Sequence, residues 1–182
     1  IEEFESFVRR ELNQTAQRRM AVLRPLKLTL TNWPVDAEGN PIVEYFEVTN
    51  NPERAEDGLR RMPFSGSLYI EQDDFAEVPP PRYFRLSPGR EVRLRGAYFV
   101  TATDCVKNEQ GEVIEVLATY DPATRGGDAP DGRKVKSTMH WVSAAHAVDA
   151  SVALYERLFT TKVPGEETGE ALDDLNPNSR TI

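Results

Sequence analysis

Apolar residues recur at helical spacing over the first twelve positions. The stripe consists of Ile1, Phe4, Val8 and Leu12, and most positions between them are charged. A spacing of three to four residues predicts an amphipathic helix. The stripe already includes the first residue, and the sequence does not begin with Met. We therefore expect a piece of a longer protein that starts inside a helix and stops in a loop or strand.

After residue 20 the spacing of apolar residues changes to two. Leu26, Leu28 and Leu30 alternate with polar neighbours, which predicts a half-buried strand. Further strands are predicted at 42–48, 67–70, 92–100, 113–120, 134–142 and 152–159. Turn signals rich in Gly, Pro and Asn separate these stretches. Many short strands predict a barrel or sandwich, and their number suffices for two small barrels.

Composition excludes several classes of protein. The chain has 182 residues, a net charge of −8, one cysteine and two histidines. It lacks an apolar run near the ~20 residues of a membrane-spanning helix. One cysteine excludes an internal disulfide framework and favours a reducing compartment. Cys105, His140 and His146 lack partners at metal-ligand or nucleophile spacing, so we predict no metal site and no catalytic residue.

The acidic total hides a basic stretch between residues 79 and 100. Its bases are Arg82, Arg85, Arg90, Arg93 and Arg95, and its only acid is Glu91. The planar guanidinium fork suits two-point contacts with phosphate or a guanine edge. Aromatic residues, among them Phe84, are interleaved with the arginines. Arginines with exposed rings are typical of surfaces that bind single-stranded RNA.

Strand geometry sharpens this prediction. In a strand over 92–98, Arg93 and Arg95 share one side and lie about 6.8 Å apart, near the spacing of successive phosphates. The alternative is a solvated face whose arginines pair with the acids of 73–77. A second basic cluster occupies 131–136. By alternation, Lys134, Lys136 and His140 lie on one side of a strand. They either contact RNA or form the solvated outer face of a hairpin.

Four segments resemble the class I glutaminyl-tRNA synthetases. They cover 18–28, 62–75, 85–98 (RLSPGREVRLRGAY) and 132–147, which includes GRKVK and MHWVSAAHA. The segments occur in the family's order and span nearly the whole chain. The resemblance therefore implies the C-terminal anticodon-binding region of that family.

The resemblance implies a mainly β fold of two small antiparallel β-barrels. Residues 1–20 would form a helical junction from the preceding catalytic part. Residues 21–71 and 143–182 would form the proximal anticodon-binding barrel, incomplete at its C-terminus. Residues 72–142 would form the distal barrel, inserted in the proximal one.

The resemblance also assigns residues to the three anticodon bases. Arg18 matches an arginine near the middle base, a uridine. Arg85 matches the arginine that reads the third base, a guanine, whose O6 and N7 acceptors suit a guanidinium fork. Arg93 and Arg95 match arginines around the first base and its phosphate.

Two positions of this set depart from the family pattern. Arg82 stands where a glutamine is expected, and it can still contact RNA. Phe84 stands where a lysine is expected, and it can stack on a base but cannot make a charged contact. We predict both as RNA-binding residues.

The function implied is recognition of the tRNA(Gln) anticodon for glutamine–tRNA ligase, a cytoplasmic monomer without membrane contact. Glutamine, ATP and Mg²⁺ would bind to the catalytic domain, whose ATP-binding signatures are absent from these residues. Three alternatives stay open: a eukaryotic-type glutamyl-tRNA synthetase, a non-enzymatic ribosomal RNA-binding barrel and a protein-interaction module. The run 140–146, HWVSAAH, favours glutamine over glutamate.

Overall fold

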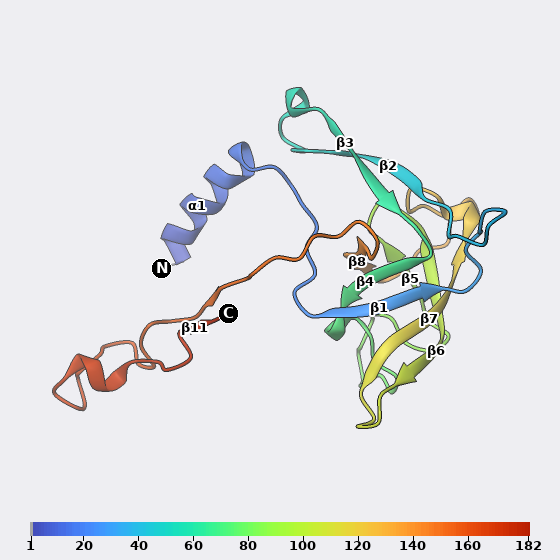
Figure 1. Cartoon of the computed structure of the whole chain (residues 1–182). Coiled ribbons are helices and arrows are strands. Elements are labelled where there is room, and N and C mark those ends of the chain that lie inside the picture. Colours follow the sequence, from blue (N-terminus) through green and yellow to red (C-terminus); the bar gives the residue numbers. More distant parts are fainter. Residues whose placement is uncertain (1) are drawn as a thin grey trace. The chain divides into compact units, whose positions relative to one another are not determined.

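The computed structural model describes residues 2–182 and divides the chain into two compact units, one ending at Ala147 and one covering Val148–Ile182 (Figure 1). The first unit contains α1 (Glu2–Thr15), β1 (Pro25–Leu30), β2 (Glu44–Thr49), β3 (Leu59–Phe64), β4 (Ser67–Glu71), β5 (Glu91–Leu94), β6 (Phe99–Lys107), β7 (Val113–Asp121), β8 (Thr138–Met139) and β9 (Val142–Ser143). Its 3-10 turns are η1 (Ala55–Asp57), η2 (Gln72–Asp74) and η3 (Pro122–Thr124). The second unit contains β10 (Leu154–Tyr155), η4 (Ala171–Asp174) and β11 (Arg180–Thr181).

Seven strands form one curled sheet, a half-barrel, in the order β8-β5-β6-β7-β1-β4-β9. The mainly β prediction is confirmed, and the closure of two separate barrels stays a prediction. Two ladders, β1–β7 and β5–β8, are parallel, so the prediction of antiparallel pairing throughout is wrong. These pairs join strands distant in sequence, where no tight hairpin imposes antiparallel geometry.

The alternation predicted for β1 is confirmed, because Leu26, Leu28 and Leu30 are all buried. They belong to one core that also holds the fully buried Trp141 and Phe64, whose rings meet edge to face at 4.8 Å. Burial of such apolar area is the main stabilising contribution to the sheet.

The strand predicted at 92–100 is interrupted. Leu94 ends β5, and a turn at 95–98 leads into β6, with Gly96 at φ +67°. A left-handed backbone cannot continue a strand, which makes the segment a hairpin. The prediction for 134–142 is also too long, because only β8 and the start of β9 are strands there. Similarly, only β10 forms within 152–159.

The N-terminal helix is confirmed as α1, whereas its first predicted stripe residue, Ile1, lies outside the described residues. Phe4, Val8 and Leu12 of the stripe are exposed. The helix ends against the β2–β3 hairpin, where the buried Asn51 donates from Nδ2 to the carbonyl oxygens of Asn13 and Gln14. None of the helices within residues 2–182 is long and apolar enough to span a membrane.

Candidate nucleic-acid interface

Three predicted RNA-binding residues lie in a loop that is anchored beside η2. The Leu86 N–H donates to the Asp74 carbonyl oxygen at 3.0 Å, and the Ala76 N–H donates to the Leu86 carbonyl oxygen at 3.1 Å. Leu86 is fully buried. Three consecutive prolines at 79–81 restrict the backbone of the loop. The residues at 82–85 are therefore presented from a fixed base.

Arg85 extends from this base toward solvent while one end of its guanidinium is held. Its Nη1 donates to Oδ1 of Asp74, and the two side chains are 52% and 7% exposed. Burial raises the pKa of Asp74, and the guanidinium of Arg85 and the nearby His140 partly offset that effect. The acids of 73–77 are the partners that the alternative prediction assigned to the strand-face arginines, but Asp74 pairs with the loop residue Arg85, and Arg93 pairs with Asp128 instead.

Arg82 and Phe84 are both exposed beside this pair. Arg82 adopts φ +66°, a left-handed conformation uncommon for a residue with a side chain. No hydrogen bond or ion pair with another described residue engages its guanidinium. The Nζ of Lys136 lies over the Phe84 ring, 4.9 Å from the ring centroid, in a cation–π contact. Lys136 thus places a cation beside Phe84, the position at which the resemblance led us to expect a lysine.

Arg93 lies on the side of β5 that faces away from the main core. Its guanidinium carbon lies 5.4 Å from the centroid of the buried Phe99 ring, and Nη2 pairs with Asp128 at 3.1 Å. Its Nε is buried and has no hydrogen-bond partner among the described residues. Arg133 covers the same ring at 5.4 Å. Arg93 is therefore half-buried, and contacts with Phe99 and Asp128 constrain its guanidinium.

Arg95 lies in the β5–β6 turn, so the predicted continuous strand face that would carry both Arg93 and Arg95 is wrong. The Arg95 N–H donates to the Met139 carbonyl oxygen at 2.9 Å, and its own carbonyl accepts from Trp141 Nε1 at 3.0 Å. These bonds fix the backbone, while the side chain is exposed and has no polar partner within residues 2–182.

The β5–β8 ladder brings the two basic clusters together. Arg93 is opposite Thr138 in this parallel pair, and opposed residues share a side of the sheet. Residues 134, 136, 138 and 140 are all exposed, as alternation predicted, although most of this stretch is not strand. Phe84 meets Lys136 of this stretch, and the Arg95 backbone is bonded to Met139. We call Arg82, Phe84, Arg85, Arg95 and the exposed residues of 134–140 the basic–aromatic surface.

Arg18 lies apart from that surface, at the end of α1. Its guanidinium donates to the carbonyl oxygens of Leu12, Asn13 and Ala16 at 3.3, 3.2 and 2.9 Å. A cation at this point satisfies carbonyl groups that a helix leaves unpaired. The Arg18 N–H also donates to the Asn50 carbonyl oxygen at 2.6 Å. Arg18 thus fastens the helix to the β2–β3 hairpin.

Sequence reasoning did not single out Asp74 or Arg133 as organising residues. Arg133 pairs with Glu91 through two bonds of 3.0 Å, and it also binds Asp121 and Asp131. These bonds raise the pKa of its guanidinium and tie the segment before β8 to β5 and β7. The partners lie up to 42 residues away in sequence, so no local pattern signals them.

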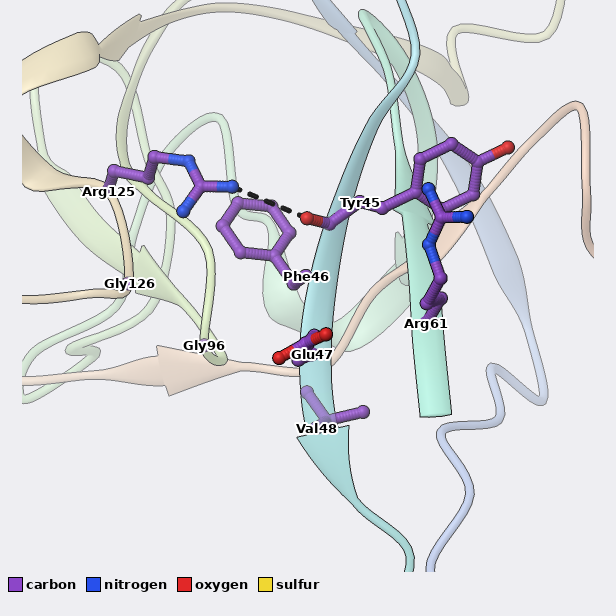
Figure 2. Close-up of a pocket in the computed structure, with 8 residues that line it drawn as sticks. All are labelled: Tyr45, Phe46, Glu47, Val48, Arg61, Gly96, Arg125 and Gly126. Atoms are coloured by element: carbon purple, nitrogen blue, oxygen red, sulfur yellow. Dashed lines mark hydrogen bonds between the residues drawn. The ribbon is translucent and has the colours of Figure 1, made fainter. Parts of the chain in front are cut away.

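A groove of about 670 Å³ is lined by residues 45–48 of β2 together with Arg61, Gly96, Arg125 and Gly126 (Figure 2). Arg125 reaches over it, donating to the Tyr45 carbonyl oxygen at 3.3 Å and covering the Phe46 ring at 4.7 Å. On the other side of the strand, Arg61 stacks on the Tyr45 ring at 4.0 Å. Gly96 also lines the groove, which therefore adjoins the basic–aromatic surface.

The chemistry available on these surfaces is recognition through planar cations and rings. Among residues 2–182, no three His, Cys, Asp or Glu side chains are placed to hold a metal ion. Arg82 and Arg95 offer guanidinium groups that have no polar partner among the described residues, and Phe84 offers a ring. Such groups bind phosphates, base edges and unstacked bases.

Comparison with known proteins agrees with this geometry. Residues 16–121 match a family model described as tRNA synthetases class I (E and Q), anti-codon binding domain, and residues 138–182 match a second model of the same description. Among curated relatives, the glutamine–tRNA ligase of Bradyrhizobium diazoefficiens is 55% identical over 96% of this chain. Those of Nitrobacter hamburgensis and Clostridium kluyveri are 56% and 48% identical over 94% and 97% of it.

This chain spans about 30% of the length of those relatives. The first family model alone covers more than half of the chain, from the residue after α1 to the end of β7, and so includes the β2–β3 hairpin and β5. The chain therefore belongs to the family of anti-codon binding domains of the class I tRNA synthetases (E and Q).

Proposed function

We propose that this chain recognises the anticodon of tRNA(Gln) for a glutamine–tRNA ligase. The observation that carries the proposal is the basic–aromatic surface, where exposed arginines, a ring and the lysines of 134–136 converge from separate segments. The names of the relatives favour glutamine over glutamate as the amino acid. The family match disfavours a ribosomal barrel.

In this proposal each anticodon base is held apart from its neighbours. Arg85 reads the guanine at the third position, Arg93 and Arg95 bind around the first base and its phosphate, and Arg18 contacts the middle base. Arg82 and Phe84 complete the surface, with Lys136 supplying the cation next to Phe84. Unstacked bases expose both edges and faces to such side chains.

The two-barrel organisation is part of the same proposal. Strands β5, β6, β7 and β8 pair among themselves, as do β1, β4 and β9. Only the β1–β7 ladder joins these two sets in the sheet. The first set falls within 72–142 and supports a distal barrel there. The second supports a proximal barrel over 21–71 and 143–182, preceded by the junction 1–20.

The chemical step belongs, in this proposal, to a catalytic domain outside these residues. That domain binds glutamine, ATP and Mg²⁺, activates the amino acid and transfers it to the tRNA 3′ end. This chain contributes specificity, in a protein that we propose to be a cytoplasmic monomer.

The test is binding of a labelled anticodon stem–loop of tRNA(Gln) and of its three third-base variants, followed by fluorescence anisotropy. We expect the guanine form to bind about 5- to 150-fold more tightly, since one two-point base contact contributes about 1–3 kcal/mol of discrimination. Arg85→Lys keeps the charge beside Asp74 but loses the fork, so it should remove most of that preference. Equal affinity of the wild-type chain for all four RNAs would contradict the proposal.

A further inference from the structure

The pair between Arg85 and Asp74 is asymmetric. The carboxylate is almost completely buried, whereas about half of the guanidinium side chain is exposed. Only Nη1 is engaged by Asp74, and the donors on Nη2 and Nε have no partner within residues 2–182. One end of the fork is thus anchored in protein while the other is available to a ligand.

The backbone around the pair is fixed independently of the side chains. Phe75 and Leu86 form a parallel bridge, and both side chains are buried in the core. Asp74 and Arg85 each immediately precede one of these bridged residues. The carboxylate therefore occupies a defined position relative to the Cα of Arg85, and it selects one orientation of a side chain that has many rotamers.

Stability does not account for this arrangement. Burying a carboxylate carries a large desolvation cost, which a pair with a half-exposed partner offsets only in part. The raised pKa of Asp74 has the same cause. Glu71 raises the pKa of Asp74 further by repulsion, and Arg85 and His140 act against this. An uncharged residue of the same shape would fill the site at lower cost.

We propose that Asp74 is a positioning residue that determines specificity for the third anticodon base through Arg85. It holds Nη1 so that the Nη2 and Nε donors face the guanine acceptors before RNA binds. Pre-orientation of the Arg85 side chain reduces the conformational entropy that is lost on binding. This gain is available only to a base whose acceptors match the fixed guanidinium, so it favours that base over the others. This inference rests on the proposed function.

The experiment is a double-mutant cycle on the four third-base stem–loops. It uses the wild-type chain, Asp74→Asn, Arg85→Gln and the double variant, with thermal unfolding measured for each. We expect Asp74→Asn to lower the preference for guanine about tenfold while the unfolding temperature stays the same or rises. In the Arg85→Gln background the same change should cause no further loss, because its effect passes through Arg85.

Asp74→Glu provides a second, charge-preserving variant that does not depend on the folding of Asp74→Asn. Its longer side chain displaces the anchor, so we expect a partial loss of preference. Two results would overturn the inference: a guanine preference that is unchanged in both Asp74 variants, or an equal loss of affinity for all four RNAs. If Arg85→Gln still loses the preference in the same experiment, the proposed function stands and only the inference fails. If the wild-type chain itself shows no preference, the proposed function fails together with the inference.

Discussion

At the scale of single residues, the six predicted RNA-binding residues differ in how far their side chains already contact other parts of the protein. Arg18 caps a helix, Arg85 is held by Asp74, and Arg93 covers Phe99. Arg82 and Arg95 have no side-chain partner within residues 2–182. Arginines that are already held by the protein lose little rotamer freedom on binding, so we expect Arg18, Arg85 and Arg93 to contribute specificity. We expect Arg82 and Arg95 to contribute general affinity for phosphates.

Arg95→Ala should weaken binding of every stem–loop by a similar factor. The slope of log affinity against log salt should fall by roughly 0.7 to 0.9, the change expected for one lost phosphate contact. Affinity titrations between 50 and about 200 mM salt measure it. Lys27→Ala, which removes a cation paired internally with Glu115, is the control and should leave the slope unchanged. A slope that Arg95→Ala does not alter counts against a phosphate contact.

Acid should weaken the network around Arg133. The hydrogen bond from the Arg133 side chain is the main reason that the pKa of Asp121 lies below the ordinary aspartate value of 3.8. A carboxyl with a lowered folded pKa stabilises the fold above its unfolded pKa, and this contribution disappears as pH falls through the folded value. Arg133→Ala should therefore unfold at lower denaturant concentration than wild type at pH 7, and the difference should shrink below about pH 4. Denaturant titrations at both pH values test it; a constant difference argues against the pairing.

At the scale of elements, the β5–β6 turn decides where Arg95 points. Gly96 has φ +67°, and a Cβ there would meet no heavy atom within 4 Å. Any effect of Gly96→Ala thus comes from the left-handed backbone and should be about 1–2 kcal/mol of lost stability. Because the turn also carries Arg95, RNA affinity should fall as well.

Gly111→Ala is the matched control for that prediction. Gly111 also has a positive φ, +82°, with open space around a Cβ, and it lies in the β6–β7 hairpin. Its replacement should lower the unfolding temperature to a similar extent and leave RNA affinity at the wild-type value. An affinity loss of the same size in both variants would mean that general destabilisation, rather than the placement of Arg95, is responsible.

The helix α1 depends on its anchor more than on its own packing. Its apolar side chains are exposed within the described chain, and isolated helices of 14 residues are marginal in water. Arg18 and Asn51 supply hydrogen bonds to its last turn. Arg18 is therefore both a predicted RNA contact and a helix cap, so its replacement will change both.

At the scale of the whole molecule, the net charge of −8 does not oppose RNA binding. The basic–aromatic surface carries Arg82, Arg85, Arg95, Lys134 and Lys136, whereas five of the six charged residues after 165 are acidic. An RNA requires only a local cationic surface, and surrounding acids reduce adhesion to unrelated RNA.

The separation of recognition from chemistry gives a prediction for the whole chain. With ATP, glutamine and Mg²⁺, this chain should bind the tRNA(Gln) stem–loop and show no ATP–pyrophosphate exchange. A full-length glutamine–tRNA ligase is the positive control for the exchange reaction. Exchange above background would overturn the assignment of chemistry to another domain.

Local pattern in the sequence determined the strands β1, β4 and β7, the amphipathic helix and the clustering of arginines, because these depend on neighbours two to four residues apart. The resemblance to the synthetases also came from contiguous segments. Sequence pattern failed at Gly96, where a single left-handed residue turned one predicted strand into a hairpin.

Only the tertiary structure decided which of these groups meet. The parallel β5–β8 ladder placed the two basic clusters on one side, and the anchored loop put Arg85 over a buried Asp74. It likewise placed Arg133 among acids from three segments. The Arg85–Asp74 and Arg133–Glu91 pairs join residues 11 and 42 positions apart, and they form because burying the shared core fixes the strands that carry them.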